Sequence, residues 1–190
     1  RLRPRRKTVE PDPFPPAETA PVPGNRADQS RKLLPPPPLP ADRIVTLGQT
    51  VRLGSLELTP LEVKAGSVTL LRQINRAQAR QGGEATLSLK LRLKNVSIDS
   101  ILVPLDEAFL RERGREVRDS FIETGPTGQI AMFPLAVVSE WSIVGQEFRE
   151  LGPGESYETR VVSAPDALAH LVPEMTWRIR FRTDVNQTET

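Results

Sequence analysis

Cysteine is absent from this chain, and histidine occurs only once, at His170. Without thiols the chain cannot form a disulfide, bind structural zinc or an iron–sulfur cluster through thiolates, or use thiol catalysis. A single imidazole excludes sites that need several of them. No stretch approaches the run of about 18 apolar residues that a membrane-spanning helix requires, so we expect that the given segment does not cross a membrane.

Arrangements typical of catalytic sites are also scarce. A Ser–His–Asp system would have to use His170, and no Gly-x-Ser-x-Gly elbow supplies its serine. Asp106, Glu107 and Glu112 lie close in sequence, but neighbours on a strand point to opposite faces, so we interpret them as solvated loop charges. No calcium-binding loop or phosphate-binding glycine motif occurs. We therefore predict no catalytic residue, no cofactor and no metal site.

Proline and positive charge are concentrated in the first 43 residues. This segment holds 12 of the 19 prolines, and its nine basic and five acidic residues give a net charge of +4. Phe14 is its only aromatic residue, so it cannot bury enough apolar surface to offset the entropy of ordering. Proline lacks an N–H and fixes φ, which blocks helices and sheets. We predict that residues 1–43 form a disordered linker, with polyproline II structure at Pro35–Pro40.

The first seven residues, Arg-Leu-Arg-Pro-Arg-Arg-Lys, form a basic cluster without an initiator methionine, and we expect a fragment or a processed chain. One interpretation places the cluster beside a membrane, where each Lys or Arg gains about 1 kcal/mol from anionic lipid. The other is an arbitrary start within a charged linker. Basic flanks favour the cytoplasmic side of a membrane, which would place the domain inside the cell. Nucleic-acid binding is disfavoured because no aromatic residues interleave with these charges.

Residues 44–190 show the alternation of β-strands. Leucines at positions 87, 89, 91 and 93 alternate with serine and basic residues, and this period of two places one row of side chains on each face of a strand. Trp177, Ile179 and Phe181 alternate with arginines in the same way. Such strands are half buried, as in an antiparallel sheet with one face in water.

Glycine- and proline-rich turns divide this region into seven to nine short strands. A hairpin is predicted around Gly54-Ser55, with Pro60 at an edge or a bulge. A separate strand is predicted at Ser67–Ile74, followed by a polar loop at Asn75–Glu84, and a later helical turn is capped by Asp166. The absence of long amphipathic helices indicates a two-sheet sandwich. The predicted core is Leu56, Leu58, Val63, Leu87, Leu89, Leu91, Leu93, Phe109, Trp141, Tyr157, Val161, Trp177, Ile179 and Phe181.

Several segments together resemble a known family. The first hairpin, Leu47–Leu58, is similar to the start of bacterial telokin-like, immunoglobulin-like extracytoplasmic domains of unknown function. The long strand at Leu87–Ser97 ends in an Asn-containing turn, as theirs does. Leu151–Ser156 matches their Leu-x-Pro-Gly-Glu-Ser turn, and a strand ending at Pro165 follows.

The resemblance extends over Leu47–Thr183, although Arg111–Ile143 fits poorly and is interpreted as an insertion. It implies the fold class all-β, with an immunoglobulin-like antiparallel β-sandwich at residues 44–190 preceded by the disordered Pro-rich linker. It also implies a membrane-anchored, extracytoplasmic location. It implies no catalytic residues, because the family has no established ones.

Two rows of basic residues form a predicted docking face. If their strands were neighbours, like charges would repel across the sheet unless carboxylates such as Glu57, Glu62 or Glu158 neutralised them. Without such partners the rows would bind an anionic ligand or a protein, and with them they would be a solvated face of mixed salt bridges. The rows consist of Lys90, Arg92 and Lys94, and of Arg178, Arg180 and Arg182. Asn95-Val96-Ser97 and Asn186-Gln187-Thr188 also match the glycosylation sequon.

These features favour a non-enzymatic, membrane-tethered extracytoplasmic module that binds another protein or a cell-surface polymer. The alternative is a small-ligand carrier or a carboxylate-based hydrolytic enzyme on the same sandwich, in which raised carboxyl pKa values would mark the site. A third hypothesis makes Pro35–Pro40 a ligand for an aromatic groove of another domain. The alternative location is the cytoplasmic face of a membrane.

Overall fold

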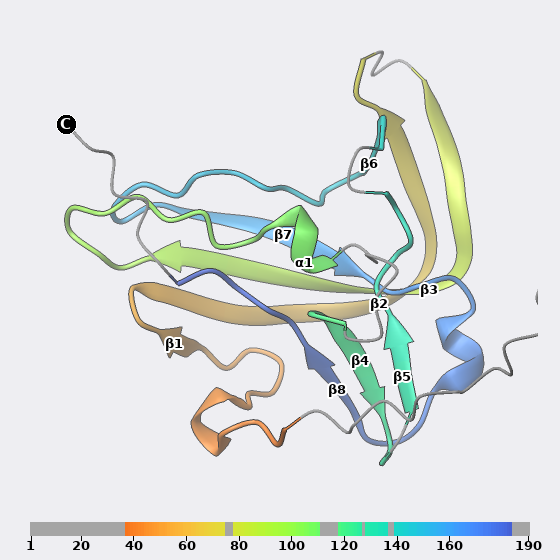
Figure 1. The fold of residues 1–190 in the computed structure, drawn as a ribbon, viewed down its shortest axis with the longest axis horizontal. Coiled ribbons are helices and arrows are strands. Elements are labelled where there is room, and N and C mark those ends of the chain that lie inside the picture. The colour runs from red at the N-terminus through yellow and green to blue at the C-terminus, as the bar shows by residue number, and fades with distance from the viewer. Residues whose placement is uncertain (1–36, 75–77, 111–117, 127, 137–138, 184–190) are drawn as a thin grey trace, which may run out of the picture. The chain divides into compact units, whose positions relative to one another are not determined.

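Two antiparallel sheets dominate the computed structural model, which describes residues 37–74, 78–110, 118–126, 128–136 and 139–183. The larger sheet has the strand order β1-β2-β3-β7, with β6 added beside β2, and the smaller has the order β5-β4-β8 (Figure 1). The strands are β1 (Val51–Leu53), β2 (Leu56–Arg72), β3 (Ala79–Asn95), β4 (Phe121–Thr124), β5 (Gly128–Ala131), β6 (Trp141–Ile143), β7 (Ser156–Val162) and β8 (Met175–Arg178). Short helical segments are η1 (Ala41–Arg43), α1 (Glu107–Leu110) and η2 (Ala167–His170).

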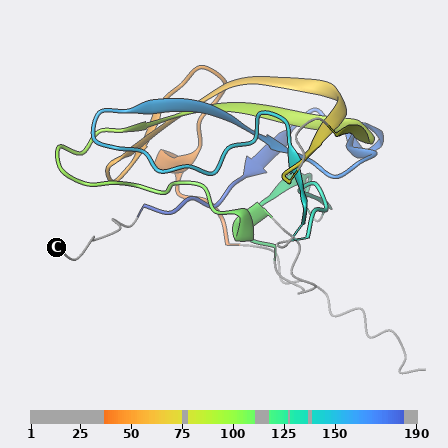
Figure 2. The same ribbon diagram turned by 90° about the horizontal axis from the view of Figure 1, so that it is seen from above.

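The two sheets pack face to face around the main core. The alternating leucines of β3 point into it, and Leu91 and Leu93 are 1% and 0% exposed. Ile122 and Ile130 contribute from the smaller sheet. In Figure 2 the long strands of the larger sheet lie along one side of the sandwich and α1 lies on the opposite side. The predicted all-β sandwich is therefore confirmed, while the predicted linker lies outside the described residues up to residue 36.

Several predicted core residues are less buried than expected. The prediction that Val63 lies in the core is wrong, because it is 37% exposed at the start of a mostly exposed stretch of β2. Phe109 and Trp141 are only half buried. The apolar residues of the predicted last strand, Trp177, Ile179 and Phe181, pack against the main core from its margin and are also half buried. The other predicted core residues are buried.

The β2–β3 hairpin is much longer than the sequence suggested. Ser67–Ile74 is not a separate strand but the continuation of β2, and the predicted loop Asn75–Glu84 contains the first residues of β3. Both strands have 17 residues. The register shifts between Pro60 and Glu62, as expected for a proline at a bulge, and again between Gly66 and Val68. Polar residues and glycines in the first part of β3 interrupt the alternation of apolar and polar side chains, so the sequence pattern did not indicate a strand there.

We call the part of this hairpin beyond the second register shift, residues 67–74 and 78–85, the arm. β6 pairs with it along β2, so the arm is a three-stranded extension of the larger sheet (Figure 1). At the base of the arm β3 carries two positive φ angles, 32° at Gly83 and 54° at Ala85. Three residues of β3, 83–85, stand opposite a single residue of β2, and this bulge redirects the strand.

The arm has a small core of its own. This core joins arm residues to the segments before and after β6, and it consists of Val68, Leu70, Phe133, Leu135, Ile143 and Val162, with Trp141 packed against it. Val161 belongs to the main core, so two adjacent residues of β7 serve the two cores from opposite faces of the strand. Gly82 makes the packing possible, because a Cβ there would lie 2.8 Å from Leu70 Cδ1.

The C-terminal region differs from the prediction in two details. β8 ends at Arg178, although the chain beyond it is still tied to its neighbours by backbone hydrogen bonds such as Arg182 N to Pro104 O. The predicted helical turn is the 3-10 segment η2. Asp166 does not cap it through its side chain and instead has a left-handed conformation with φ of 63°, which Asp tolerates better than most residues.

Candidate functional site

The two basic rows lie in different sheets, because β3 belongs to the larger sheet and β8 to the smaller. They are therefore not neighbours, and the condition under which like charges would repel across one sheet is not met. Each row has instead acquired its own carboxylate partners. Within the described residues, five of the six basic side chains form an ion pair, and the sixth, Lys94, stands opposite Glu57 in the β2–β3 register.

Glu158 on β7 neutralises most of the β3 row. Its carboxylate lies 2.6 Å from Lys90 Nζ and 2.8 Å from Arg92 Nη2. Hydrogen bonds from these two side chains hold the pKa of the Glu158 carboxyl below its ordinary value. All three side chains are at least one-third exposed, so the pairs add little to stability, but they reduce the positive field of this face.

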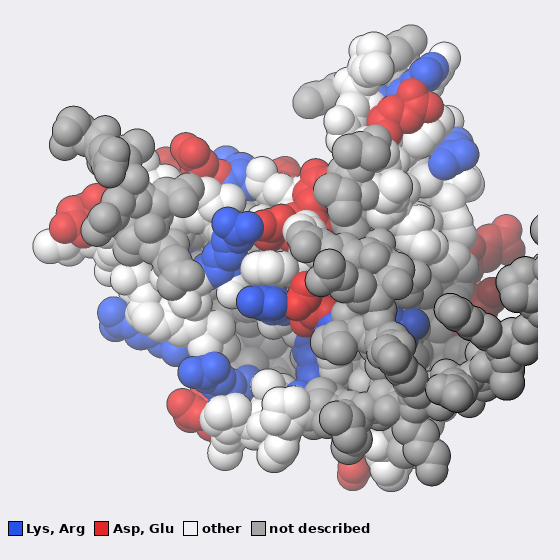
Figure 3. Space-filling model, in the orientation of Figure 1, with Lys and Arg blue, Asp and Glu red and all other residues white. Residues whose placement is uncertain are grey.

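The arginines at the end of β8 and in the segment after it are each matched to a different carboxylate. Arg178 Nε lies 2.8 Å from Glu123 Oε2, Arg180 Nη1 lies 2.6 Å from Asp119 Oδ1, and Arg182 pairs with Asp106. The Arg180 guanidinium also lies 4.5 Å from the centre of the Phe109 ring. Figure 3 shows basic and acidic side chains interleaved on this side of the molecule. The arrangement is that of a surface with mixed salt bridges.

The candidate catalytic carboxylates have structural contacts. Asp106 accepts a hydrogen bond from Ala108 N at 2.8 Å and pairs with Arg182, so it fixes the turn that begins α1. Glu107 lies in the first turn of α1, and Glu112 lies outside the described residues. His170 is exposed in η2. No group of three or more His, Asp or Glu side chains that could hold a metal ion occurs in the described part of the chain.

A shallow depression between α1 and β6 offers no room for a ligand. Its lining is mostly apolar and carries no titratable side chain; the residues are Leu110, Met132, Phe133, Ile143, Gln146 and Val162. Tyr157 is a separate buried polar group. Its hydroxyl lies near the backbone of Arg149 but makes no hydrogen bond of ordinary geometry among the described residues, and burial raises its pKa to about 12. It is therefore neutral at physiological pH and belongs to the main core.

Asn95 fastens one end of the sandwich. Its side chain is fully buried, and Nδ2 donates to Ser100 O at 2.6 Å and to Leu151 O at 2.9 Å. Oδ1 accepts hydrogen bonds from the backbone N–H and the hydroxyl of Ser97. Because both amide hydrogens are used inside the protein, the Asn95 sequon is inaccessible to glycosylation in the folded state. The second sequon, at Asn186, lies outside the described residues.

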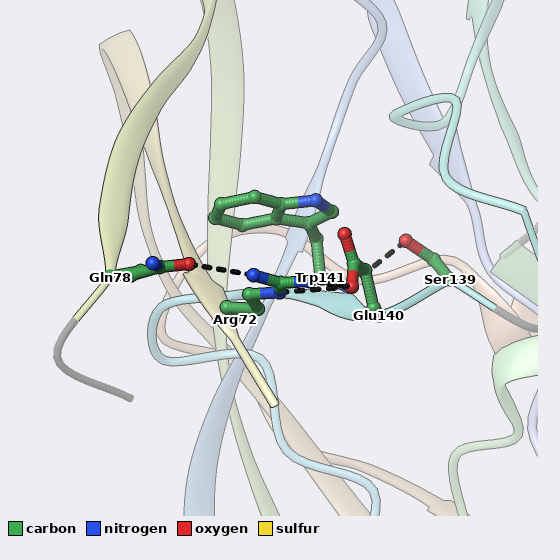
Figure 4. Close-up of polar contacts among 5 residues, drawn as sticks. All are labelled: Arg72, Gln78, Ser139, Glu140 and Trp141. Carbon is green, nitrogen blue, oxygen red and sulfur yellow. Dashed lines mark hydrogen bonds and ion pairs between the residues drawn. The ribbon is translucent and has the colours of Figure 1, made fainter. Parts of the chain in front are cut away.

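The free end of the arm carries a cluster of a different kind. Arg72 Nη1 donates to Gln78 Oε1 at 2.9 Å, and Arg72 Nη2 lies 2.8 Å from Glu140 Oε2, beside the indole of Trp141 (Figure 4). The Arg80 guanidinium lies 4.2 Å from the centre of the Trp141 ring. Ile74, two residues after Arg72, is 86% exposed. We call these residues the arm-tip cluster: Arg72, Ile74, Gln78, Arg80, Glu140 and Trp141.

Reasoning from the sequence missed this cluster. The sequence predicts Trp141 in the core, and Gln78 and Arg80 in a loop. The sequence shows a polar segment at residues 75–84 and a long apolar segment at residues 130–141. Neither pattern indicates that the two segments lie side by side. β6 brings them together, since Trp141 pairs with Arg72 in the register of β2 and β6.

Among the described residues no helix is long and apolar enough to cross a membrane. No protein-family model, curated protein or solved structure matches this chain.

Proposed function

We propose that this chain is a non-enzymatic binding module that holds another protein through the arm-tip cluster. The observation that carries the proposal is the 86% exposure of Ile74 beside a stacked tryptophan and arginine at the end of an arm with its own core. Tryptophan and arginine are the residues most often found at the energetic centres of protein interfaces. Burying an isoleucine side chain contributes roughly 1.5–3 kcal/mol.

The second core supports this role by holding the cluster in place before a partner arrives. Phe133 and Leu135 pack beneath the arm, and Arg72 connects the three arm strands through Gln78 and Glu140. A surface that is already ordered loses less conformational freedom on binding. The basic rows contribute less to this proposal, because most of their charge is paired within the chain.

The location that fits this role is extracytoplasmic, with the module tethered to a membrane through the Pro-rich segment. The composition of residues 1–43 and the resemblance to extracytoplasmic immunoglobulin-like domains support it. A stiff proline-rich spacer would hold the arm away from the membrane surface.

Affinity capture with the full chain tests the function. The probe is a solubilised membrane extract, and the variant is Ile74→Ser combined with Arg80→Glu. We expect specific partners to be lost with this variant and retained with Ile98→Ser, a matched control because Ile98 is 93% exposed. A partner so identified should then bind the purified chain at least tenfold more weakly when the arm tip is changed. Equal binding by all three proteins would contradict the proposal.

A further inference from the structure

One edge of the larger sheet is open along the arm. Between Ala79 and Gly82, β3 pairs with β2 on one side only, whereas from Ser88 onward its other edge pairs with β7. Figure 1 shows this side of the arm facing away from β6. Among the described residues no backbone group pairs with this edge.

The register determines which backbone groups the edge presents. Arg72 N donates to Gln78 O, so these two residues form a hydrogen-bonded pair of the antiparallel ladder. Because such pairs alternate, Ala79 and Gln81 belong to the intervening positions, whose N–H and C=O groups point away from β2. The other side of β2 confirms this alternation, since Thr69 O and Gln73 N point toward β6 and bond to Val144 and Glu140.

The base of the arm limits the open edge. Asp166 N donates to Glu84 O at 3.3 Å, and Pro165 lies against Gly83, where a Cβ would come within 2.8 Å of its ring. The bulge at residues 83–85 also bends the strand away from a straight path. Four residues remain, from Ala79 to Gly82, and their two outward positions provide four backbone hydrogen-bonding groups.

The charge on this edge indicates which type of residue a strand added to it would carry. Arg80 is exposed and stacks on Trp141, and no described carboxylate forms an ion pair with it, whereas its neighbour Arg72 is neutralised by Glu140. A residue directly opposite Arg80 on an added strand would project on the same face of the sheet. An Asp or Glu there would complete an ion pair, and apolar residues two positions away would reach the arm-tip cluster.

We propose that the protein partner contributes an extended segment with an acidic residue opposite Arg80, which adds as a further strand to the edge of β3 at Ala79–Gly82. Strand addition of this kind takes its affinity from main-chain hydrogen bonds and its specificity from alternate side chains. The proposal rests on the proposed function, because it specifies how the arm binds its partner.

The test uses a phage-displayed library of random octapeptides selected on the full chain, followed by synthesis of the consensus peptide. We expect an acidic residue within an alternating apolar pattern, and at least tenfold weaker binding to Gln81→Pro and to Arg80→Glu. Proline at position 81 removes an N–H that points outward, so the β2–β3 ladder stays intact. Gln81→Thr, which keeps the N–H, is the matched control and should bind as the parent does. Thermal melting checks that each variant is folded.

Amide hydrogen exchange gives a second readout. The amides of Ala79 and Gln81 should become protected when the consensus peptide binds. Failure to select any peptide, or a peptide that binds Gln81→Pro as well as the parent, would overturn strand addition. The proposed function would survive that result if the protein captured from membranes still distinguished Ile74→Ser from Ile98→Ser.

Discussion

The sandwich and the arm share the strands β2 and β3 but are stabilised differently. In the sandwich, β3 has a covered face on which Leu89, Leu91 and Leu93 are at most 4% exposed. In the arm, the same strand contributes glycines and polar residues, and the burial comes from Phe133 and Leu135 of a distant segment. Regular alternation thus makes a strand part of a central core, whereas loss of alternation allows it to project and to expose an edge.

The largest expected loss of stability comes from substitutions in the two cores, and its size should distinguish them. Leu91→Ala should lower the free energy of unfolding by about 3–5 kcal/mol, because the cavity forms in the fully packed sandwich. Leu70→Ala should cost about 2–3 kcal/mol and should act mainly on the arm, where the core is small. Urea denaturation measures the first change, and hydrogen exchange of arm amides measures the second. Equal global losses with no local difference would show that the two cores form one cooperative unit.

The second largest effect on stability is expected for the buried hydrogen bonds of Asn95. Asn95→Ala removes four hydrogen bonds and leaves the carbonyls of Ser100 and Leu151 without their donor, so we expect a loss of about 2–3 kcal/mol. Asn95→Asp should destabilise the protein more at pH 7 than at pH 4, since the ionised carboxylate would face those carbonyl oxygens. Urea melts at the two pH values provide the measurement. An Asp variant with the parent's stability at pH 7 would contradict the assignment of Nδ2.

A buried hydroxyl tests the apolar character of the main core. Tyr157→Phe removes a buried hydroxyl that makes no hydrogen bond of ordinary geometry among the described residues and should stabilise the protein by up to about 1 kcal/mol at pH 7. The folded pKa of about 12 lies above the ordinary value of 10.0. Between pH 10 and pH 12 the tyrosine ionises more readily in the unfolded chain than in the folded one, so rising pH favours unfolding of the parent. The parent should thus lose stability relative to the Phe variant over that window in alkaline denaturation experiments.

A substitution at the bulge at the base of the arm should raise the stability of the protein, whereas most substitutions lower it. Ala85 has φ of 54°, a conformation that costs a residue with a Cβ about 1 kcal/mol or more. Ala85→Gly should therefore stabilise the protein by about 0.5–1 kcal/mol. Thermal melting measures the change, and Ala79→Gly, in regular strand, is the control expected to destabilise. Destabilisation by both glycines would argue against a strained bulge.

The smallest effect concerns the ion pairs on the outer face of the sandwich. The lowered pKa of Glu158 means that its contribution is present above the ordinary carboxyl pKa and is lost as the pH falls through the folded value. The stability difference between the parent and Glu158→Gln should therefore shrink in acid and in high salt. Denaturation at pH 7 and pH 3, with and without salt, checks this expectation. A difference that grew in acid would have the wrong sign.

The sequence predicted the parts of the fold in which one local period continues. The leucines of β3 lie where their alternation placed them, the hairpin at Gly54-Ser55 forms as its turn predicted, and Tyr157 and Val161 of β7 are buried as predicted. The core prediction is wrong for Val63 because this part of β2 is mostly exposed, a property that its local alternation does not reveal. It is wrong for Trp141 because the residues that pair with it come from an arm that the pattern did not reveal. The cluster at the arm tip could not be predicted, since its members lie up to 69 positions apart in the chain.

The sequence by itself determined that this protein is an antiparallel β-sandwich without thiol chemistry, because side-chain period and composition are local properties. It also determined which strands carry positive charge. Only the tertiary structure decided that Glu158, Glu123 and Asp119 neutralise those charges, and that one edge of β3 stays open beside Trp141. Ion pairing and edge exposure depend on which distant segments meet, and that is set by the packing of two cores rather than by any single strand.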